Sequence, residues 1–449
     1  MIQKLLVANR GEIAVRIIRT AKEMGIKTVA VFSEPDKESL HVKLADEAYC
    51  IGPALASDSY LNTINLLNVA TLTECDAIHP GYGFLAENAD FAELCEECNI
   101  VFIGPSSDTI RKMGAKDVAR QTMIEAGVPV TLGSNGKIND MNEAVNIARD
   151  IGYPVIIKAT AGGGGKGIRV ARNEQELIDG IRITQQEAKS AFGDPNVYLE
   201  KYITDFRHVE VQILGDNHGN VIHLGERDCT IQRRRQKLLE ETPSPQISAK
   251  VREKMMETSI KAAKAVNYSG AGTIEFIYDL QANEFYFMEM NTRIQVEHPV
   301  TEMVTGIDIV KEQINVASGE KLKYKQADIE FKGWAIECRI NAENPIKNFM
   351  PSPGMITKYL PAGGRGVRVD SAAYSGYAIP PYYDSMIAKL IVFAENREQA
   401  ISCMRRALEE FVITGVETTI PFHSKLLAHK AFISGNFNTN FLDSHNILS

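Results

Sequence analysis

With 449 residues, of which 44% are hydrophobic and 24% charged, the chain has the composition of an ordinary globular protein with room for two or three domains. Its net charge of −8 argues against nucleic-acid binding, and its apolar runs fall short of the ~20 residues that span a bilayer. Seven scattered cysteines and a first strand without a signal-peptide pattern before it indicate a reducing, cytoplasmic compartment.

The first hundred residues alternate strands and helices, which predicts a parallel α/β unit. We expect strands at 2–8, 27–32, 48–51, 77–78 and 100–103, and helices at 11–24, 60–72 and 88–98. The turn Asn9-Arg10-Gly11-Glu12 has one glycine, so a Rossmann-like shape is expected without the dinucleotide fingerprint. The loop His79 to Asn88 follows a strand and is either an ordinary connection or a ligand-binding loop. Cys95 and Cys98 form a lone CxxC in a helical pattern, which does not indicate a metal site.

Residues 107–126 predict a helix, 128–130 a connector, and 131–203 a smaller unit. That unit has expected helices at 141–151 and 174–191 and strands at 153–158, 168–170 and 197–203. Gly162, Gly164 and Gly167 match GxGxxG, but the strand-like Ile168-Arg-Val170 follows where a nucleotide fingerprint needs a helix. A glycine flap bracketed by Lys158 and Lys166 favours phosphate binding, and a flexible surface loop is the alternative.

From residue 205 the pattern predicts a larger sheet, with strands at 208–214, 221–224 and 335–340 and a helix at 250–266. A basic cluster (Arg233, Arg234, Arg235 and Lys237) lacks the aromatic residues of a nucleic-acid surface, so substrate phosphates are the better acceptors. In the strand 335–340, Arg339 shares a face with Glu337 and Ala335. Turns are expected at 351–354 and 380–385, and a last helix at 398–411.

Two β-rich runs, 272–278 and 285 onwards, predict an antiparallel hairpin around the polar connector 279–284. Alternation places Phe287, Glu289, Asn291 and Arg293 on one face, continued by Gln295 and Glu297 if the chain stays extended. A register that sets Glu275 opposite Glu289 brings two carboxylates together, and a hard cation such as Mg²⁺ relieves their repulsion. The alternative is an edge strand with a solvated polar face.

Taken together, the glycine flap after Lys158, Glu200-Lys201 at a strand end and the Glu289-Met-Asn-Thr-Arg293 run resemble the ATP-grasp superfamily. The closer resemblance is to its biotin carboxylase family, through strings spread from residue 8 to about residue 390. These strings are Ala8-Asn-Arg-Gly-Glu12, His79-Pro-Gly-Tyr-Gly-Phe-Leu-Ala-Glu-Asn88, Glu289-Met-Asn-Thr-Arg-Ile-Gln-Val-Glu-His298, Glu337-Cys-Arg-Ile-Asn-Ala-Glu343 and Tyr382-Tyr-Asp-Ser-Met386.

The resemblance implies a site for ATP, Mg²⁺ (or Mn²⁺), bicarbonate and biotin. ATP would be contacted by residues of the lid and the sheet: Lys116, Lys158, Gly164, Gly165, Glu200, Lys201, Tyr202, Ile203, His208, Gln232, Arg235 and Ile277. It implies metal ligation by Glu275, Glu289 and Asn291, and bicarbonate binding by Lys237, Arg293, Gln295 and the backbone of Val296. Glu297 would be the base and Arg339 would hold biotin. The family commonly has histidine where this chain has Arg235, so that contact is altered.

The resemblance also implies a multi-domain α/β and α+β fold. It combines an N-terminal Rossmann-like (pre-ATP-grasp) domain at 1–113, a linker helix region at 114–130, a glycine-flap lid at 131–203 and a large mixed-sheet region at 204–449. The implied reaction is the first half-reaction of acetyl-CoA carboxylase, through carboxyphosphate, by a stand-alone homodimeric subunit. Without a Met-Lys-Met type biotin-attachment site, the chain is expected to act on a biotin carboxyl carrier protein and to work with carboxyltransferase subunits.

Several alternatives stay open at this level. Within the fold, they are a purine-pathway carboxylase, a carbamoyl phosphate synthetase domain, or the biotin carboxylase subunit of a pyruvate or other acyl-CoA carboxylase. Outside it, they are a non-catalytic ATP-binding regulator and a nicotinamide dehydrogenase, which the missing glycine fingerprint disfavours.

Overall fold

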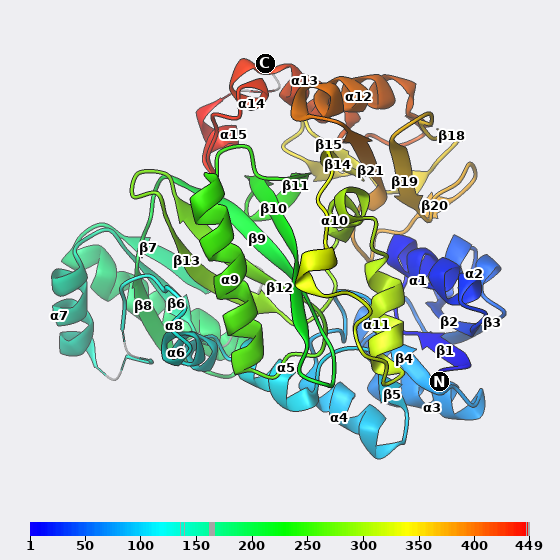
Figure 1. Cartoon of the computed structure of the whole chain (residues 1–449), viewed down its shortest axis with the longest axis horizontal. Coiled ribbons are helices and arrows are strands. Elements are labelled where there is room, and N and C mark those ends of the chain that lie inside the picture. The colour runs from blue at the N-terminus through cyan, green and yellow to red at the C-terminus, as the bar shows by residue number, and fades with distance from the viewer. Residues whose placement is uncertain (135, 139, 161–166, 446, 448–449) are drawn as a thin grey trace.

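A computed structural model describes residues 1–134, 136–138, 140–160, 167–445 and 447. Its N-terminal unit is the expected parallel sheet, in the order β3-β2-β1-β4-β5, with helices on its faces (Figure 1). The strands are β1 (Lys4–Val7), β2 (Lys27–Ser33), β3 (Glu47–Gly52), β4 (Ala77–His79) and β5 (Val101–Phe102). The helices are α1 (Gly11–Glu23), α2 (Leu40–Leu44), α3 (Thr63–Leu72), α4 (Ala89–Glu97) and α5 (Ser107–Gly114). Each predicted element of this unit is confirmed, with ends that differ by a few residues.

The loop from His79 to Asn88 leaves β4 and ends where α4 begins. Asn88 caps that helix, since its side-chain oxygen accepts the backbone N–H of Phe91 at 2.8 Å. The predicted single helix at 107–126 is instead two helices, α5 and α6 (Lys116–Glu125). Ala115 between them has an extended backbone (ψ 103°) and breaks the helix.

The smaller unit is a three-stranded antiparallel sheet, β7-β6-β8, covered by two helices. Its elements are α7 (Met141–Ile151), β6 (Val155–Ala159), β7 (Ile168–Ala171), α8 (Glu174–Phe192) and β8 (Val197–Lys201). Val155, Ile157, Leu177 and Leu199 form a core of this unit's own residues. We call it the lid; in Figure 1 it lies at the left, away from the C-terminal helices.

The largest element is an eight-stranded sheet in the order β13-β12-β9-β10-β11-β14-β21-β19, whose neighbouring strands all pair antiparallel. The resemblance implied a mixed sheet, whereas the pairing of these eight strands is antiparallel throughout. The strands are β9 (Phe206–Gly215), β10 (Val221–Arg233), β11 (Gln236–Thr242), β12 (Gly270–Asp279), β13 (Glu284–Asn291), β14 (Trp334–Asn341), β19 (Val367–Ser371) and β21 (Met386–Ala394). Its helices are α9 (Ala249–Ala265), α10 (His298–Thr305) and α11 (Ile309–Ala317).

Short strands and a helical cluster complete the C-terminal part, at the top of Figure 1. The strands are β15 (Glu343–Asn344), β16 (Met350–Pro351), β17 (Gly354–Met355), β18 (Lys358–Leu360), β20 (Ala378–Ile379) and β22 (Val412–Thr414). The helices are α12 (Arg397–Glu410), α13 (Ile420–Ala428), α14 (Lys430–Ile433) and α15 (Phe441–Ser444). Among the helices of the described ranges, none is both long and apolar enough to cross a membrane.

The sequence had suggested that the basic cluster faces substrate phosphates. In the structure, its four side chains do not share one loop. β10 runs on to Arg233 and turns through Arg234 and Arg235 directly into β11. Arg233 donates to the backbone and side-chain oxygens of Asn348, at 2.7 and 2.6 Å. Lys237 instead points inward, so the hairpin separates the four basic side chains.

In the central hairpin, Glu275 lies directly opposite Glu289, as predicted, and Thr273 lies opposite Asn291. A bulge follows, because Phe276 pairs with Phe287 and one residue of β13 is left over. Phe287 is therefore on the core face, and the prediction that it shares a face with Glu289 is wrong. The bulge allows Phe287 to fill the core while Glu289 and Asn291 face the site.

Candidate active site

The hairpin β12–β13 places oxygen ligands beside one another, on the sheet face opposite its core. Glu275 is buried, and its Oε1 accepts the side-chain N–H groups of Asn291 at 2.9 Å and of Gln295 at 3.1 Å. Glu289 is more exposed, and its Oε2 lies 3.6 Å from the Nζ of Lys116 on α6. The expected row of side chains from Arg293 to Glu297 required an extended chain. Residues 292–297 instead form a turn, which brings the Gln295 side chain onto Glu275.

Next to the hairpin, a single ammonium group is shared by three buried carboxylates. The Nζ of Lys237 on β11 lies 2.6 Å from Glu210, 3.0 Å from Glu275 and 2.7 Å from Glu297. Burial alone lowers a lysine pKa, but the three negative charges raise the pKa of Lys237 well above its ordinary value. Burial likewise opposes ionisation of Glu275, yet Lys237 and His208 hold its pKa below the usual range. These shifts favour the charged forms of Lys237 and Glu275, whereas burial and the charge of Glu297 raise the pKa of Glu210.

Glu297, at the start of α10, is held between two cations. Its Oε1 accepts from Lys237, and its Oε2 accepts from Arg339 on β14 at 3.0 Å. Burial raises the pKa of Glu297, but Lys237 and Arg339 outweigh that effect and hold it well below its ordinary value. Arg339 is fixed in turn by Glu240, whose Oε1 accepts its Nε–H at 2.6 Å. The carboxylate and the guanidinium thus have defined orientations before any ligand binds.

Arg293 is positioned by groups from two parts of the chain. Its Nε donates to Glu87 of the N-terminal loop at 2.7 Å, and another guanidinium N–H donates to the Gln295 side-chain oxygen at 2.7 Å. Glu87 also accepts the backbone N–H of Thr292 at 3.1 Å. The loop 79–88 therefore contacts the site through Glu87, which favours the ligand-site interpretation over an ordinary connection.

A second group of charged side chains is centred on Glu200 of the lid. Lys158 on β6 donates to Glu200 on β8 at 2.6 Å, and Arg120 lies 3.9 Å from the same carboxylate. Lys201 turns away, because its ammonium donates to the carbonyls of Gly152 and Tyr153 at 3.0 and 3.1 Å. The predicted nucleotide contacts Gly164 and Gly165, together with Gly162 and Lys166 of the flap, lie outside the described residues.

The remaining candidates lie along the same sheet. His208 on β9 contacts Glu275 at 2.9 Å through Nε2, and its Nδ1 lies 2.7 Å from the Gln232 amide. Tyr202 and Ile203 follow β8 and are half-buried, and so is Ile277 on β12. Val296 precedes Glu297, and its carbonyl accepts a hydrogen bond from Lys389 at 2.9 Å.

The oxygen donors of Glu275, Glu289 and Asn291 fit a hard divalent cation such as Mg²⁺. Two other groups have ligand atoms within 4.8 Å of one another: His208 with Glu210 and Glu275, and Glu210 with Cys229 and Glu297. Lys237 already provides a cation to the carboxylates of both groups, so a metal ion there would meet an ammonium. Glu275 of the hairpin set also contacts Lys237, at 3.0 Å, so the hairpin metal site stays a prediction.

Several residues that shape this site were not predicted. They are Glu87, Glu210, Arg227 and Glu240. Arg227 holds Glu210 and Gln212 at 2.6 Å each. The alternation rule, applied to β9 as it was to β13, would have placed Glu210 on the face of His208. Glu87 lay inside a quoted motif, but its contact spans 206 residues of chain and leaves no local signal.

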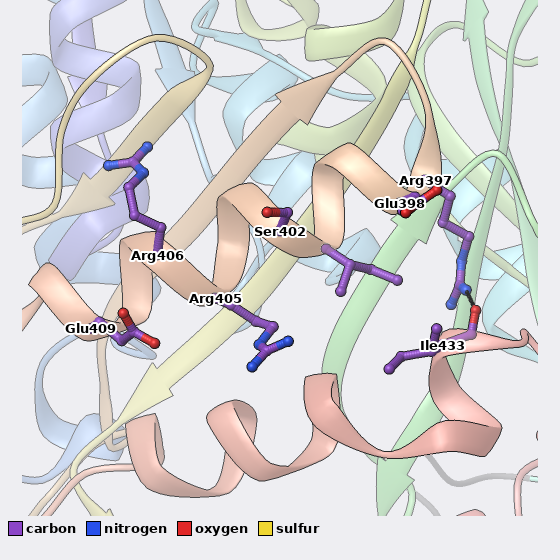
Figure 2. A pocket seen from close by; sticks show the side chains of 8 residues that line it. Arg397, Glu398, Ser402, Arg405, Arg406, Glu409 and Ile433 are labelled. Atoms are coloured by element: carbon purple, nitrogen blue, oxygen red, sulfur yellow. Dashed lines mark hydrogen bonds between the residues drawn. The ribbon is translucent and has the colours of Figure 1, made fainter.

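A separate hollow lies along α12, away from these charges (Figure 2). Its lining is Arg397, Glu398, Ile401, Ser402, Arg405, Arg406, Glu409 and Ile433. Arg397 is used by the fold, since it donates to Glu241 at 2.7 Å and to the carbonyl of Ile433 at 2.7 Å. Ser402 is the hydroxyl among its described lining residues, and no histidine accompanies it there.

Three family models match successive parts of the chain. They are the biotin carboxylase N-terminal domain at residues 1–110, the carbamoyl-phosphate synthase L chain ATP binding domain at 115–325, and the biotin carboxylase C-terminal domain at 337–444. Biotin carboxylase 1 of Bacillus subtilis is 70% identical over 448 residues, which is 100% of both chains.

Two solved structures are similar along almost the whole chain. A biotin carboxylase complex from Campylobacter jejuni, described as a beta-gamma-ATP complex, has a TM-score of 0.97 and 52% identity and covers 99% of both chains. The biotin carboxylase domain dimer of the Hydrogenobacter thermophilus 2-oxoglutarate carboxylase, with MgADP, ADP and bicarbonate, has a TM-score of 0.95 and 54% identity. It covers 99% of this chain and 98% of that one.

Proposed function

The chain belongs to the biotin carboxylase family, and from this premise we propose that it carboxylates biotin at the expense of ATP and bicarbonate. The observation that carries the proposal is the row Lys237–Glu297–Arg339, in which one carboxylate lies between two fixed cations, 2.7 and 3.0 Å away. Arg293 and Gln295 lie next to this row. Arg293 donates to Gln295, and Gln295 donates to Glu275, which also contacts Lys237. A small anion and a planar ureido group can both be recognised there.

ATP is proposed to bind between the lid and the large sheet. Lys116, Lys158 and His208 would face the nucleotide together with Gln232, Arg235 and the strand end from Glu200 to Ile203. Glu275, Glu289 and Asn291 would hold Mg²⁺ (or Mn²⁺), which neutralises phosphate charge when bound. Lys158 is already preoriented by Glu200, so it needs little rearrangement to meet a phosphate.

Bicarbonate is proposed to lie against Lys237, Arg293, Gln295 and the Val296 backbone. Glu297 accepts its proton, and the bicarbonate oxygen attacks the γ-phosphorus of ATP, giving carboxyphosphate and ADP. A carboxylate with a lowered pKa is a weak base. An anion that takes over part of the charge of Lys237 restores the basicity of Glu297.

Carboxyphosphate then breaks down to CO₂ and phosphate, and the phosphate takes the ureido proton of biotin. Arg339 stabilises the enolate that results, and the biotin nitrogen attacks CO₂. We propose that the biotin is presented by a carrier protein and passed on to carboxyltransferase subunits, and that the chain works as a homodimer in the cytoplasm. The identity of the final carboxyl acceptor would be set by the carboxyltransferase.

The four-part division at residues 113, 130 and 203 is proposed on the same basis. The lid between 131 and 203 has its own core, which supports its treatment as a separate unit.

ADP release measured with and without bicarbonate and free biotin, at fixed Mg²⁺, tests the proposal. We expect turnover to need bicarbonate and to rise with biotin, and carboxybiotin to appear in step with ADP. ATP binding without turnover would support a non-catalytic regulator instead. Turnover that depends on bicarbonate but ignores biotin would point to another ATP-grasp ligase.

A further inference from the structure

Lys389, in the middle of β21, is a fully buried lysine that the proposed reaction does not use. Its side chain is 0% exposed, and it lies directly opposite Arg339 on the neighbouring strand. Its Nζ lies 2.9 Å from the carbonyl oxygen of Val296, 3.1 Å from Glu12 on α1 and 4.0 Å from Asp370 on β19. Burial of an ammonium group without partners costs free energy. Its ion pairs and hydrogen bonds are therefore needed to stabilise it.

The contact with Val296 is the informative one, because charge compensation does not require it. Residues 292–297 lie between β13 and α10, outside the sheet ladder. The carbonyls of Gln295 and Glu297 accept backbone N–H groups of His298 and Val300, at 3.4 and 3.3 Å. The Val296 carbonyl between them is held by Lys389. The lysine thus fixes the peptide group that joins Val296 to Glu297.

The other side of Lys389 is anchored in the N-terminal domain. Glu12 accepts a short hydrogen bond from the hydroxyl of Tyr82, in the loop 79–88. Asp370 is already satisfied by Arg368, which donates two hydrogen bonds to it at 2.8 and 2.7 Å. Glu12 is therefore the principal charge partner of Lys389, and the chain Tyr82–Glu12–Lys389–Val296 runs from the N-terminal loop to the peptide before Glu297.

We propose that Lys389 is a positioning residue that holds the Val296 peptide, and through it Glu297 and the bicarbonate-facing backbone, in the reactive geometry. This rests on the proposed function. A shift of the order of 1 Å in a reacting group costs about 100-fold in rate. Loss of this contact should therefore lower kcat and raise the KM for bicarbonate, while the nucleotide, bound on the lid side, keeps its affinity.

The test compares Lys389→Met with the double variant Glu12→Gln/Lys389→Met. The single variant leaves Glu12 buried without its cation, so its melting temperature should fall. The double variant removes both charges, and its melting temperature should return toward wild type. Its turnover should stay about 100-fold low and its bicarbonate KM about tenfold high, because the Val296 carbonyl still lacks its donor. ATP affinity, measured by calorimetry, should stay within about threefold in both.

A matched control is Arg397→Met, which removes another largely buried cation, the partner of Glu241 in the α12 region (Figure 2). It should lower the melting temperature without raising the bicarbonate KM. If the double variant regains turnover together with stability, Lys389 only balances Glu12 and the inference is wrong. Wild-type kinetics in Lys389→Met would overturn it equally. If the wild-type chain itself shows no biotin-dependent turnover, the proposed function fails, which is a different result.

Discussion

At the residue scale, a pair of buried carboxyl groups lies next to Arg339. Glu240 on β11 is opposite Glu337 on β14, and both are 0% exposed. Within the described chain, Oε2 of Glu240 and both side-chain oxygens of Glu337 have no hydrogen-bond partner. Burial raises the pKa of Glu240 to about 7, against the opposing effect of Arg339. Burial and the neighbouring Glu240 raise the pKa of Glu337 well above its usual value, although Lys389 opposes this. The raised pKa favours the neutral form of Glu337 in the folded chain.

The raised pKa of Glu337 makes the free energy of unfolding depend on pH. Between its ordinary pKa of 4.5 and its raised native pKa, the folded chain keeps a proton that the unfolded chain has lost. Stability contributed by this group is thus complete below pH 4.5 and falls as pH rises, by about 1.4 kcal/mol per pH unit.

We predict that Glu337→Gln removes this loss, because glutamine carries no proton to lose and its N–H can donate to Glu240. The variant should be more stable than wild type above pH 4.5, and the gain should grow as the pH rises toward the native pKa of Glu337. Urea unfolding at several pH values measures it. The exposed Glu395→Gln is the control and should show no such trend. A gain that does not change with pH would mean that Glu337 is ionised in the folded chain.

Arg293 allows a sharper test of the anion site. Its bonds to Glu87 and Gln295 fix the orientation of the guanidinium before any ligand binds. Arg293→Ala should keep ATP affinity within about threefold, while biotin carboxylation falls by about 100-fold or more. Binding calorimetry and the ADP-release assay separate the two quantities. Loss of nucleotide binding would instead make Arg293 a structural residue.

At the element scale, local patterns predicted most of the fold. Alternating strands and helices identified the parallel N-terminal sheet, and the polar connector 279–284 identified the β12–β13 hairpin with Glu275 opposite Glu289. The errors arose where tertiary structure overrides local preference. The bulge after Glu275 moved Phe287 into the core, and charged residues up to Arg233 continued β10 where a loop was expected. Neither feature has a signal in the residues nearby.

The β10–β11 turn itself is unusual, and it carries the next prediction. Arg234 and Arg235 have φ of 48° and 67°, in a two-residue hairpin turn that favours Asn-Gly. Arg234→Asn should therefore stabilise the chain by about 0.5–1 kcal/mol and leave the KM for ATP unchanged. Arg235→Gly should give a similar gain in unfolding free energy but raise the KM for ATP, if Arg235 is the nucleotide contact proposed above. Equal kinetics in the two variants would argue against that contact.

At the scale of the whole molecule, the site is made of segments that are distant in sequence. Strand alternation placed Glu289 on the face of Asn291, and Arg339 on the face of Glu337, since every second side chain of a strand points the same way. It could not show that Lys237 joins Glu210, Glu275 and Glu297, because these residues lie on different strands and on a turn. Nor could it show that the N-terminal loop reaches Arg293. Contacts of this kind depend on how the domains meet.

The lid offers a prediction for the assembled molecule. Its core is formed by its own residues, so it can move as a unit, and it carries Lys158, the proposed phosphate contact, on β6. We predict that a non-hydrolysable ATP analogue with Mg²⁺ slows backbone hydrogen exchange in β6, β7 and β8. At 100 times the dissociation constant the effect should approach 100-fold, about 2.7 kcal/mol, for amides that exchange through lid opening.

Two comparisons make that prediction specific. Lys158→Met should weaken the protection of the lid, because the phosphates lose one of its charges, and chelation of Mg²⁺ should weaken it through the Glu275–Glu289 side. Amides of α9, on the core side of the large sheet, are the internal reference and should change little. Protection confined to β12 and β13 would show that the nucleotide binds the sheet without engaging the lid. In that case the lid would not exclude water from carboxyphosphate. Protection of this intermediate from hydrolysis would then need another explanation.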